Sequence, residues 1–139
     1  MPVHIANHPI VASKMTALRD RNTKPVDFRR LLKEITFYLG YEATRGLQTV
    51  STPVITPMGV KHDGVELKHN TCIIPILRAG LAMGDPMMEL LPDAAVHHIG
   101  MYRAKGSLLP IQSYHRLPKD VQCDVAFIPD PCIATSNTL

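Results

Sequence analysis

Apolar residues recur at helical spacing in the first third of the chain. The clearest case starts after residue 25, and its apolar positions are Phe28, Leu31, Leu32, Ile35 and Leu39. Thr23 is the expected cap of this helix and Gly46 its expected end. A shorter helix is predicted before it, starting near residues 8–9 and ended by residues 20–22. Asn7 is its expected N-terminal cap, and Pro9 is well placed in its first turn.

From residue 49 the pattern changes to short apolar segments between turn residues, which is typical of strands. Residues 49–58 are rich in β-branched side chains, but two prolines, Pro53 and Pro57, confine such a strand to a sheet edge or a bulge. Residues 59–70 are polar and contain glycine, so we expect a turn between paired strands there.

A continuous apolar run at residues 71–77 predicts a central parallel strand covered on both faces. Pro75 inside this run predicts a bulge or a local loss of pairing. Residues 81–91 predict a helix, which should begin near residue 84 because Pro86 fits only a first turn. Residues 95–102 form the next predicted strand, so strand, helix and strand follow one another over the length of a βαβ unit.

The last predicted strand, at residues 125–128, is apolar, and we expect it to be buried. The loop after it, residues 130–138, consists mostly of small or polar residues. Loops of this kind at the carboxyl ends of strands in α/β folds bind phosphate through backbone N–H groups and hydroxyls. Asp130 could hold ribose hydroxyls or a hydrated Mg²⁺ ion. The alternative is an ordinary strand-to-helix connection capped by Ser or Thr.

Two arginines follow the ends of predicted parallel strands. Arg78 comes directly after residues 71–77, and Arg103 closes residues 95–102, so both should lie at the same edge of the sheet. Two guanidinium groups converging on one cleft suit a diphosphate, because each can bind it bidentately. Gly80 would let the backbone approach such a ligand. The alternative for Arg78 is a surface residue in a strand–helix turn.

Composition limits the class of protein. The chain has 139 residues, 45% hydrophobic and 19% charged, as expected for one globular domain. A net charge of +3 is too weak to indicate nucleic acid as a partner. No apolar run suits a membrane span, and the first residues lack the pattern of a signal peptide, so a cytoplasmic location is expected. Three cysteines, Cys72, Cys123 and Cys132, lack metal-binding spacing and are expected to be reduced thiols. No metal site is predicted.

Four motifs give the sequence a resemblance to a known family. They are YEAT at residues 41–44, PILRAG at 75–80, HIGMYR at 98–103 and DPCIAT at 130–135. On these motifs the chain resembles uracil phosphoribosyltransferases from residue 7 to residue 139. The resemblance implies an α/β fold with a phosphoribosyltransferase-like parallel sheet core, preceded by a helical region and carrying a projecting β-hairpin at residues 104–117.

The resemblance also implies a domain organisation. Residues 1–139 would form a single, incomplete phosphoribosyltransferase domain, with a helical arm at 1–46 and the first part of the α/β core at 49–139. The sequence stops inside the loop after Asp130, whereas the family continues through a further helix, further strands and a segment that recognises uracil. The core is therefore expected to be truncated, with an exposed sheet edge.

Members of this family transfer the phosphoribosyl group of 5-phosphoribosyl 1-diphosphate (PRPP) to uracil, giving UMP and diphosphate in pyrimidine salvage. Position by position, Arg78 and Arg103 match the arginines that contact the diphosphate. Asp130 is the implied catalytic residue, which would hold the ribose hydroxyls and stabilise the developing positive charge. The implied PRPP-binding loop consists of Asp130, Pro131, Cys132, Ile133, Ala134, Thr135, Ser136, Asn137 and Thr138.

The same resemblance implies Mg²⁺ bound with PRPP, GTP as a candidate activator, and a homo-oligomer, either dimer or tetramer. Ser136 and Asn137 stand where the family has two glycines, and their side chains predict weaker phosphate binding. Two functions stay open. One is uracil phosphoribosyltransferase activity. The other is a catalytically inactive or truncated homologue that keeps a partial PRPP site and acts as a binding or oligomerising module. A fragment with no stable function alone is a third case.

Overall fold

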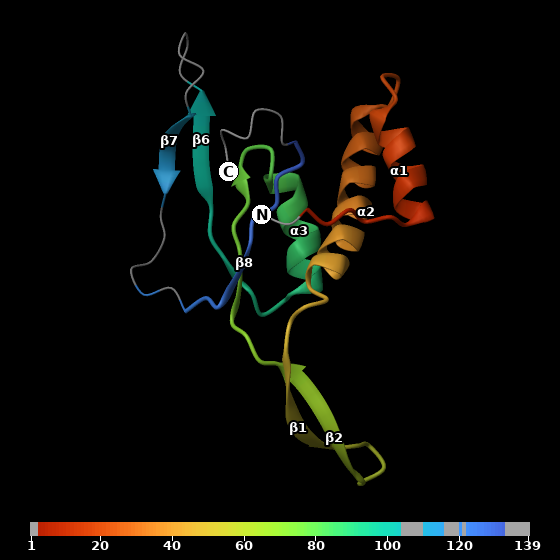
Figure 1. The fold of residues 1–139 in the computed structure, drawn as a ribbon, viewed down its shortest axis with the longest axis vertical. Helices are drawn as coiled ribbons and strands as arrows, with labels where there is room; N and C mark the ends of the chain where they lie inside the picture. Colours follow the sequence, from red (N-terminus) through yellow and green to blue (C-terminus); the bar gives the residue numbers. More distant parts are fainter. Residues whose placement is uncertain (1–2, 104–109, 116–119, 121, 133–139) are drawn as a thin grey trace.

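The computed structural model describes residues 3–103, 110–115, 120 and 122–132. Its first two elements are helices, α1 (Pro9–Arg19) and α2 (Pro25–Ala43), and α2 packs between α1 and α3 (Figure 1). All strands follow them in the chain, with α3 (Leu81–Leu90) among them. The predicted α/β class, with a helical region before the sheet, is confirmed.

The caps of the two first helices differ from the predicted ones. His8, not Asn7, caps α1: its Nδ1 accepts a hydrogen bond of 3.2 Å from the backbone N–H of Ile10. Lys24 precedes α2 without a side-chain cap, and the hydroxyl of Thr23 instead donates to the carbonyl of Ala17. Thr23 therefore closes the connection between the helices rather than starting the second one.

Strands β1 (Thr49–Ile55) and β2 (Lys61–Leu67) form an antiparallel hairpin that extends away from the rest of the molecule (Figure 1). The prediction of paired strands is confirmed, but the predicted turn was too long, because residues 61–67 belong to β2. The turn itself is closed by a hydrogen bond of 2.9 Å from the N–H of Thr56 to the carbonyl of Val60. Gly59 occupies it with a φ of 74°, a conformation that favours glycine.

The predicted parallel sheet is confirmed, in two parts. Strand β3 (Thr71–Ile73) lies between β5 (Ala95–Val96) and β8 (Val125–Phe127), parallel to both. Strand β4 (Ile76–Leu77) pairs in parallel with β6 (Ile99–Arg103), which pairs antiparallel with β7 (Pro110–His115). The hairpin predicted at residues 104–117 is formed by β6 and β7, so its first strand lies before the predicted range. Residues 104–109, which connect the two strands, lie outside the described residues.

Both long predicted strands are interrupted. The run at residues 71–77 splits at Ile74–Pro75, as Pro75 predicted. The prediction of one continuous strand at residues 95–102 was wrong. Strand β5 pairs with β3 and β6 pairs with β4, so the break between β3 and β4 is repeated in their neighbour. The N–H of His97 bonds to the carbonyl of Ile73 at 3.0 Å, between the two short ladders.

Helix α3 begins at Leu81, earlier than predicted, and Pro86 lies in its interior. The helix continues from the turn after β4, where the N–H of Gly80 bonds to the carbonyl of Ile76 at 2.8 Å. Pro86 is fully buried. Proline has no N–H and cannot donate a backbone hydrogen bond in the helix, and packing of the buried Pro86 ring offsets the free-energy cost of that missing bond.

The core lies between α3 and the sheet, where Ile73, Met87 and Leu91 are buried together. On α2, the buried apolar residues are Leu31, Leu32 and Ile35. Two residues predicted on the same apolar face are more exposed, Phe28 at 42% and Leu39 at 37%. None of the helices in the described part of the chain is long and apolar enough to cross a membrane.

Candidate functional site

The candidate site lies where parallel strands end. Strand β8 runs parallel to β3, and β4 continues the direction of β3 after the break at Pro75. The segments that follow β4 and β8 therefore both leave the sheet at its carboxyl edge. The turn after β4 consists of residues 78–80, and the segment after β8 begins at Ile128 and reaches Cys132. The two predicted binding segments are therefore neighbours in space as well as in topology.

Gly80 brings the two segments into direct contact. A Cβ atom at Gly80 would lie 2.4 Å from the carbonyl oxygen of Pro129 and 2.7 Å from the backbone nitrogen of Ile76. Its φ of −68° and ψ of −13° are ordinary for any residue. The position therefore requires glycine for lack of space, not for backbone conformation. The sequence suggested that this glycine makes room for a ligand, whereas the structure shows that it makes room for the Pro129 carbonyl.

Asp130 stands at the end of the second segment and is half-buried. Its Oδ1 accepts a hydrogen bond of 3.2 Å from the backbone N–H of Cys132, so the carboxylate orients the first turn of the loop. No cation among the described residues forms an ion pair with it. A carboxylate held from one side in this way can accept hydrogen bonds from ligand hydroxyls or contribute an oxygen to a hydrated cation.

The two predicted arginines lie at the same edge of the sheet. Arg78 is exposed in the turn after β4. The pairing of Leu77 with Gly100 places Arg103 three positions beyond that pair, about 10 Å further along β6. The backbone thus places Arg103 at the carboxyl edge but further out than Arg78.

The predicted loop is described only as far as Cys132. Pro131 and Cys132 are exposed. The rest of the predicted loop lies outside the described residues, namely Ile133, Ala134, Thr135, Ser136, Asn137 and Thr138.

An apolar cavity of about 330 Å³ opens beside Asp130. Its walls come from α2, α3 and the end of β8, and include Leu39, Met83 and Ile128. The buried strand predicted at residues 125–128 is only half-buried on this side, with Ile128 51% exposed. Sequence patterns did not reveal this cavity, because its walls come from three separate elements.

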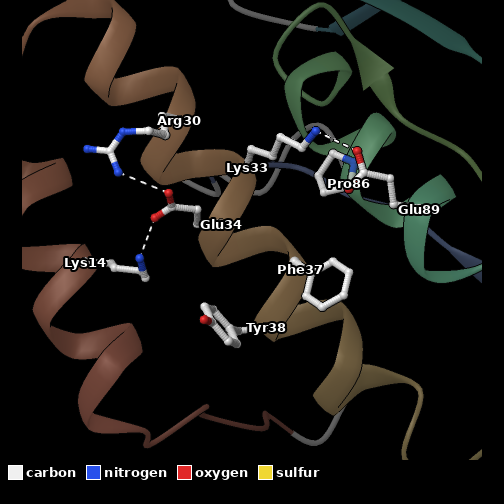
Figure 2. Close-up of a pocket in the computed structure, with 8 residues that line it drawn as sticks. All are labelled: Lys14, Arg30, Lys33, Glu34, Phe37, Tyr38, Pro86 and Glu89. Carbon is white, nitrogen blue, oxygen red and sulfur yellow. Dashed lines mark hydrogen bonds and ion pairs between the residues drawn. The ribbon is translucent and has the colours of Figure 1, made fainter.

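A larger cavity, of about 520 Å³, lies between the three helices and away from this edge (Figure 2). Its charged side chains already pair with one another: Glu34 with Lys14 and with Arg30 (3.0 Å), and Lys33 with Glu89 (2.6 Å). The hydrogen bond from Lys14, with a further one from Arg30, holds the pKa of Glu34 below its ordinary value, although burial acts in the opposite direction. No predicted site residue lines this cavity, so the carboxyl edge of the sheet remains the candidate site.

The described residues form no ready-made metal site, since no three His, Cys, Asp or Glu side chains gather among them. A hydrated Mg²⁺ ion keeps several waters and is bound through one or two carboxylates plus ligand phosphates. At this edge Asp130 is the described residue that could contribute an oxygen.

Comparison with known proteins identifies the family. The family model described as uracil phosphoribosyltransferase matches residues 5–139. The chain belongs to the uracil phosphoribosyltransferase family. The resemblance inferred from the four motifs is therefore confirmed, and it extends over nearly the whole sequence.

Individual relatives agree with this assignment. The uracil phosphoribosyltransferase of Dictyoglomus thermophilum is 43% identical over 136 residues, which cover 98% of this chain and 66% of the relative. That of Thermosipho melanesiensis is 41% identical over 135 residues. A solved structure, that of the AQ2163 protein from Aquifex aeolicus, superposes with a TM-score of 0.88 at 31% identity, covering 99% of this chain and 65% of that one. The chain spans about two thirds of the length of these two relatives and of that solved chain.

Proposed function

We propose that this chain acts in pyrimidine salvage, in the transfer of a phosphoribosyl group from PRPP to uracil, giving UMP and diphosphate. The observation that carries the proposal is the contact between the turn of Arg78 and the segment of Asp130, in a member of this family. In this reaction the bond from C1 of the ribose to the diphosphate breaks and a bond from C1 to N1 of uracil forms. The N1 proton passes to solvent.

We assign the residues at the edge of the sheet to the parts of PRPP. Arg78 and Arg103 would bind the diphosphate and stabilise the negative charge that grows on it as it leaves. Asp130 would hold the ribose hydroxyls close to the positive charge that develops on the sugar. The loop after it, residues 131–138, would hold the 5-phosphate through backbone N–H groups and hydroxyls.

We further propose that Mg²⁺ enters this site with PRPP, where it would neutralise diphosphate charge, and that Asp130 contributes to its binding. GTP as an activator and a cytoplasmic location are proposals that rest on the family resemblance. The location is also consistent with three cysteines that form no disulfide in the described residues.

We also propose that the protein forms a homo-oligomer, and the β1–β2 hairpin supports this. Two-stranded hairpins are marginally stable alone, yet this one makes its main contacts only between its own strands. Its apolar side chains are exposed by 37% to 87% and comprise Val50, Val54, Ile55, Met58, Val60, Val65 and Leu67. An exposed apolar surface of this kind is typical of a protein–protein interface.

The proposed reaction is tested by measuring PRPP binding by calorimetry with Mg²⁺, and UMP formation from PRPP and uracil. Replacing Arg78 with Ala should weaken PRPP binding about ten- to a hundredfold, because a hydrogen-bonded charge pair is lost. Arg29→Ala, which removes an exposed arginine on α2, should bind PRPP like the unchanged chain.

The outcomes separate the two open functions. If the chain forms UMP, and Arg78→Ala forms less UMP than the chain without substitutions, the result supports uracil phosphoribosyltransferase activity. PRPP binding without UMP formation favours the binding or oligomerising module. An unchanged chain that binds no PRPP contradicts the proposed site itself.

A further inference from the structure

We propose that Gly80 is a positioning residue that sets the spacing between the diphosphate-binding turn and the ribose-phosphate loop. The inference rests on the proposed function, because it concerns how one PRPP molecule reaches both segments. It assigns to Gly80 a role that does not involve touching the ligand. The absent side chain allows the Pro129 carbonyl to lie against the turn.

The contact is tight and involves main-chain atoms. A Cβ at Gly80 would lie 2.4 Å from the Pro129 oxygen, and 2.7 Å and 3.0 Å from the nitrogen and oxygen of Ile76. None of these is a flexible side chain, so a methyl group could be accommodated only if a backbone segment moved by several tenths of an ångström.

Both sides of the contact are held in place. The N–H of Gly80 donates to the carbonyl of Ile76. The carbonyl of Gly80 accepts hydrogen bonds from the N–H groups of Met83 and Gly84, at 3.0 Å and 3.1 Å. On the opposite side, the carbonyl of Phe127 accepts from the N–H of Ile74 at 2.8 Å, which ties the end of β8 to the interrupted central strand. Pro129 itself is buried.

Arg78 and Asp130 flank this contact directly. Arg78 lies two positions before Gly80, and Asp130 comes immediately after Pro129. A change at the contact therefore alters the distance between the two binding segments while leaving each one's own side chains intact.

PRPP carries a diphosphate and a 5-phosphate on one ribose and can bind both segments at once. Binding at one end raises the effective concentration of the other end, provided that the spacing matches. If Gly80 sets the spacing, its replacement should remove this advantage for PRPP and leave the two half-ligands, pyrophosphate and ribose 5-phosphate, nearly unaffected.

The test compares dissociation constants of PRPP, pyrophosphate and ribose 5-phosphate, with Mg²⁺, for three single variants of the full chain. Gly80→Ala should weaken PRPP binding about tenfold or more and each half-ligand less than about twofold. Gly46→Ala, with nothing within 4 Å of its Cβ, should change none of the three. Gly84→Ala, whose Cβ would lie 3.1 Å from the Cγ of Pro75, perturbs packing of α3 without touching Pro129 and should affect all three ligands equally.

Loss of pyrophosphate binding by the same factor as PRPP in Gly80→Ala would overturn the inference, since the turn alone would then be damaged. If Gly80→Ala does not fold, Pro129→Gly serves instead. It keeps the carbonyl that lies against Gly80 but removes the ring that restricts the backbone, so the second segment is no longer held at one spacing. It should show the same selective loss, and equal effects on all ligands would again overturn the inference. An unchanged chain that binds none of the ligands overturns the proposed function and this inference together. If the chain without substitutions binds all three ligands, but Gly80→Ala weakens their binding by equal factors, only this inference is overturned and the proposed function stands.

Discussion

Burial gives the three cysteines different environments. Cys72 is completely buried in β3, whereas Cys132 is exposed in the candidate loop. Burial, with a hydrogen bond to Cys123 as a smaller cause, raises the pKa of the Cys72 thiol to about 11. The thiolate is the reactive form of cysteine, so Cys72 should be inert in the folded protein.

Alkylation with iodoacetamide at mildly alkaline pH should therefore modify Cys132 first and Cys72 only after unfolding. Peptide mapping by mass spectrometry would identify the modified cysteine at each time point. Cys132→Ser should remove the fast phase and leave the rest unchanged. Modification of Cys72 in the folded chain at the rate of Cys132 would contradict the expectation.

Between elements, the contact of α2 with α3 depends on one glycine. A Cβ at Gly40 would lie 2.6 Å from the Sδ of Met87 and 3.0 Å from the Cδ2 of Leu90. These are flexible side-chain atoms, unlike the backbone atoms at Gly80. A small group at position 40 can therefore be accommodated by the methionine, but a larger one must push the helices apart.

Gly40→Val should lower the free energy of unfolding by about 1–3 kcal/mol, as in other overpacked cores. Met87→Ala should cost about 2–5 kcal/mol by leaving a cavity. Urea unfolding of both single variants and the double variant gives a double-mutant cycle. We expect the double variant to be more stable than the sum of the single effects, because the truncated side chain makes room for valine. Strict additivity would count against this contact, and Gly46→Val, in open space, is the control.

For the whole molecule, the exposed hairpin bears on the proposed oligomer. Ile55, Val65 and Leu67 share one face of the ribbon, because each points to the same side in the register of β1 with β2. Their exposed fractions are 64%, 70% and 47%. A second copy of the chain would cover this face and supply the packing that a lone hairpin lacks.

Replacing both Ile55 and Val65 with Lys should shift the protein toward the monomer, because charged groups resist burial in an interface. Sedimentation velocity measures the change directly. The control is His62→Lys, which adds charge on the opposite face without removing an apolar side chain. An oligomer unaffected by the double replacement would show that association uses another surface.

The sequence by itself determined much of this protein. Helical spacing of apolar residues predicted α1 and α2, and Pro75 predicted the break in the central strand, because these are local consequences of periodicity and of a missing N–H group. The apolar runs and the strand–helix–strand order predicted parallel strands, and with them the placement of Arg78 and Arg103 at one edge of the sheet. Helices, strands and the break in a strand can be predicted in this way, because the spacing of apolar residues and the missing N–H of proline act within a few residues along the chain.

Only the tertiary structure decided the rest. Strand β6 begins after a break at His97–His98 because it follows a neighbour already broken by Pro75, and Pro86 lies inside α3 because burial offsets its lost hydrogen bond. The reason for glycine at position 80 is a carbonyl that belongs to Pro129, far along the chain. Contacts between distant segments determine these features, because the atoms that exclude a side chain or bury a ring come together only when the chain folds.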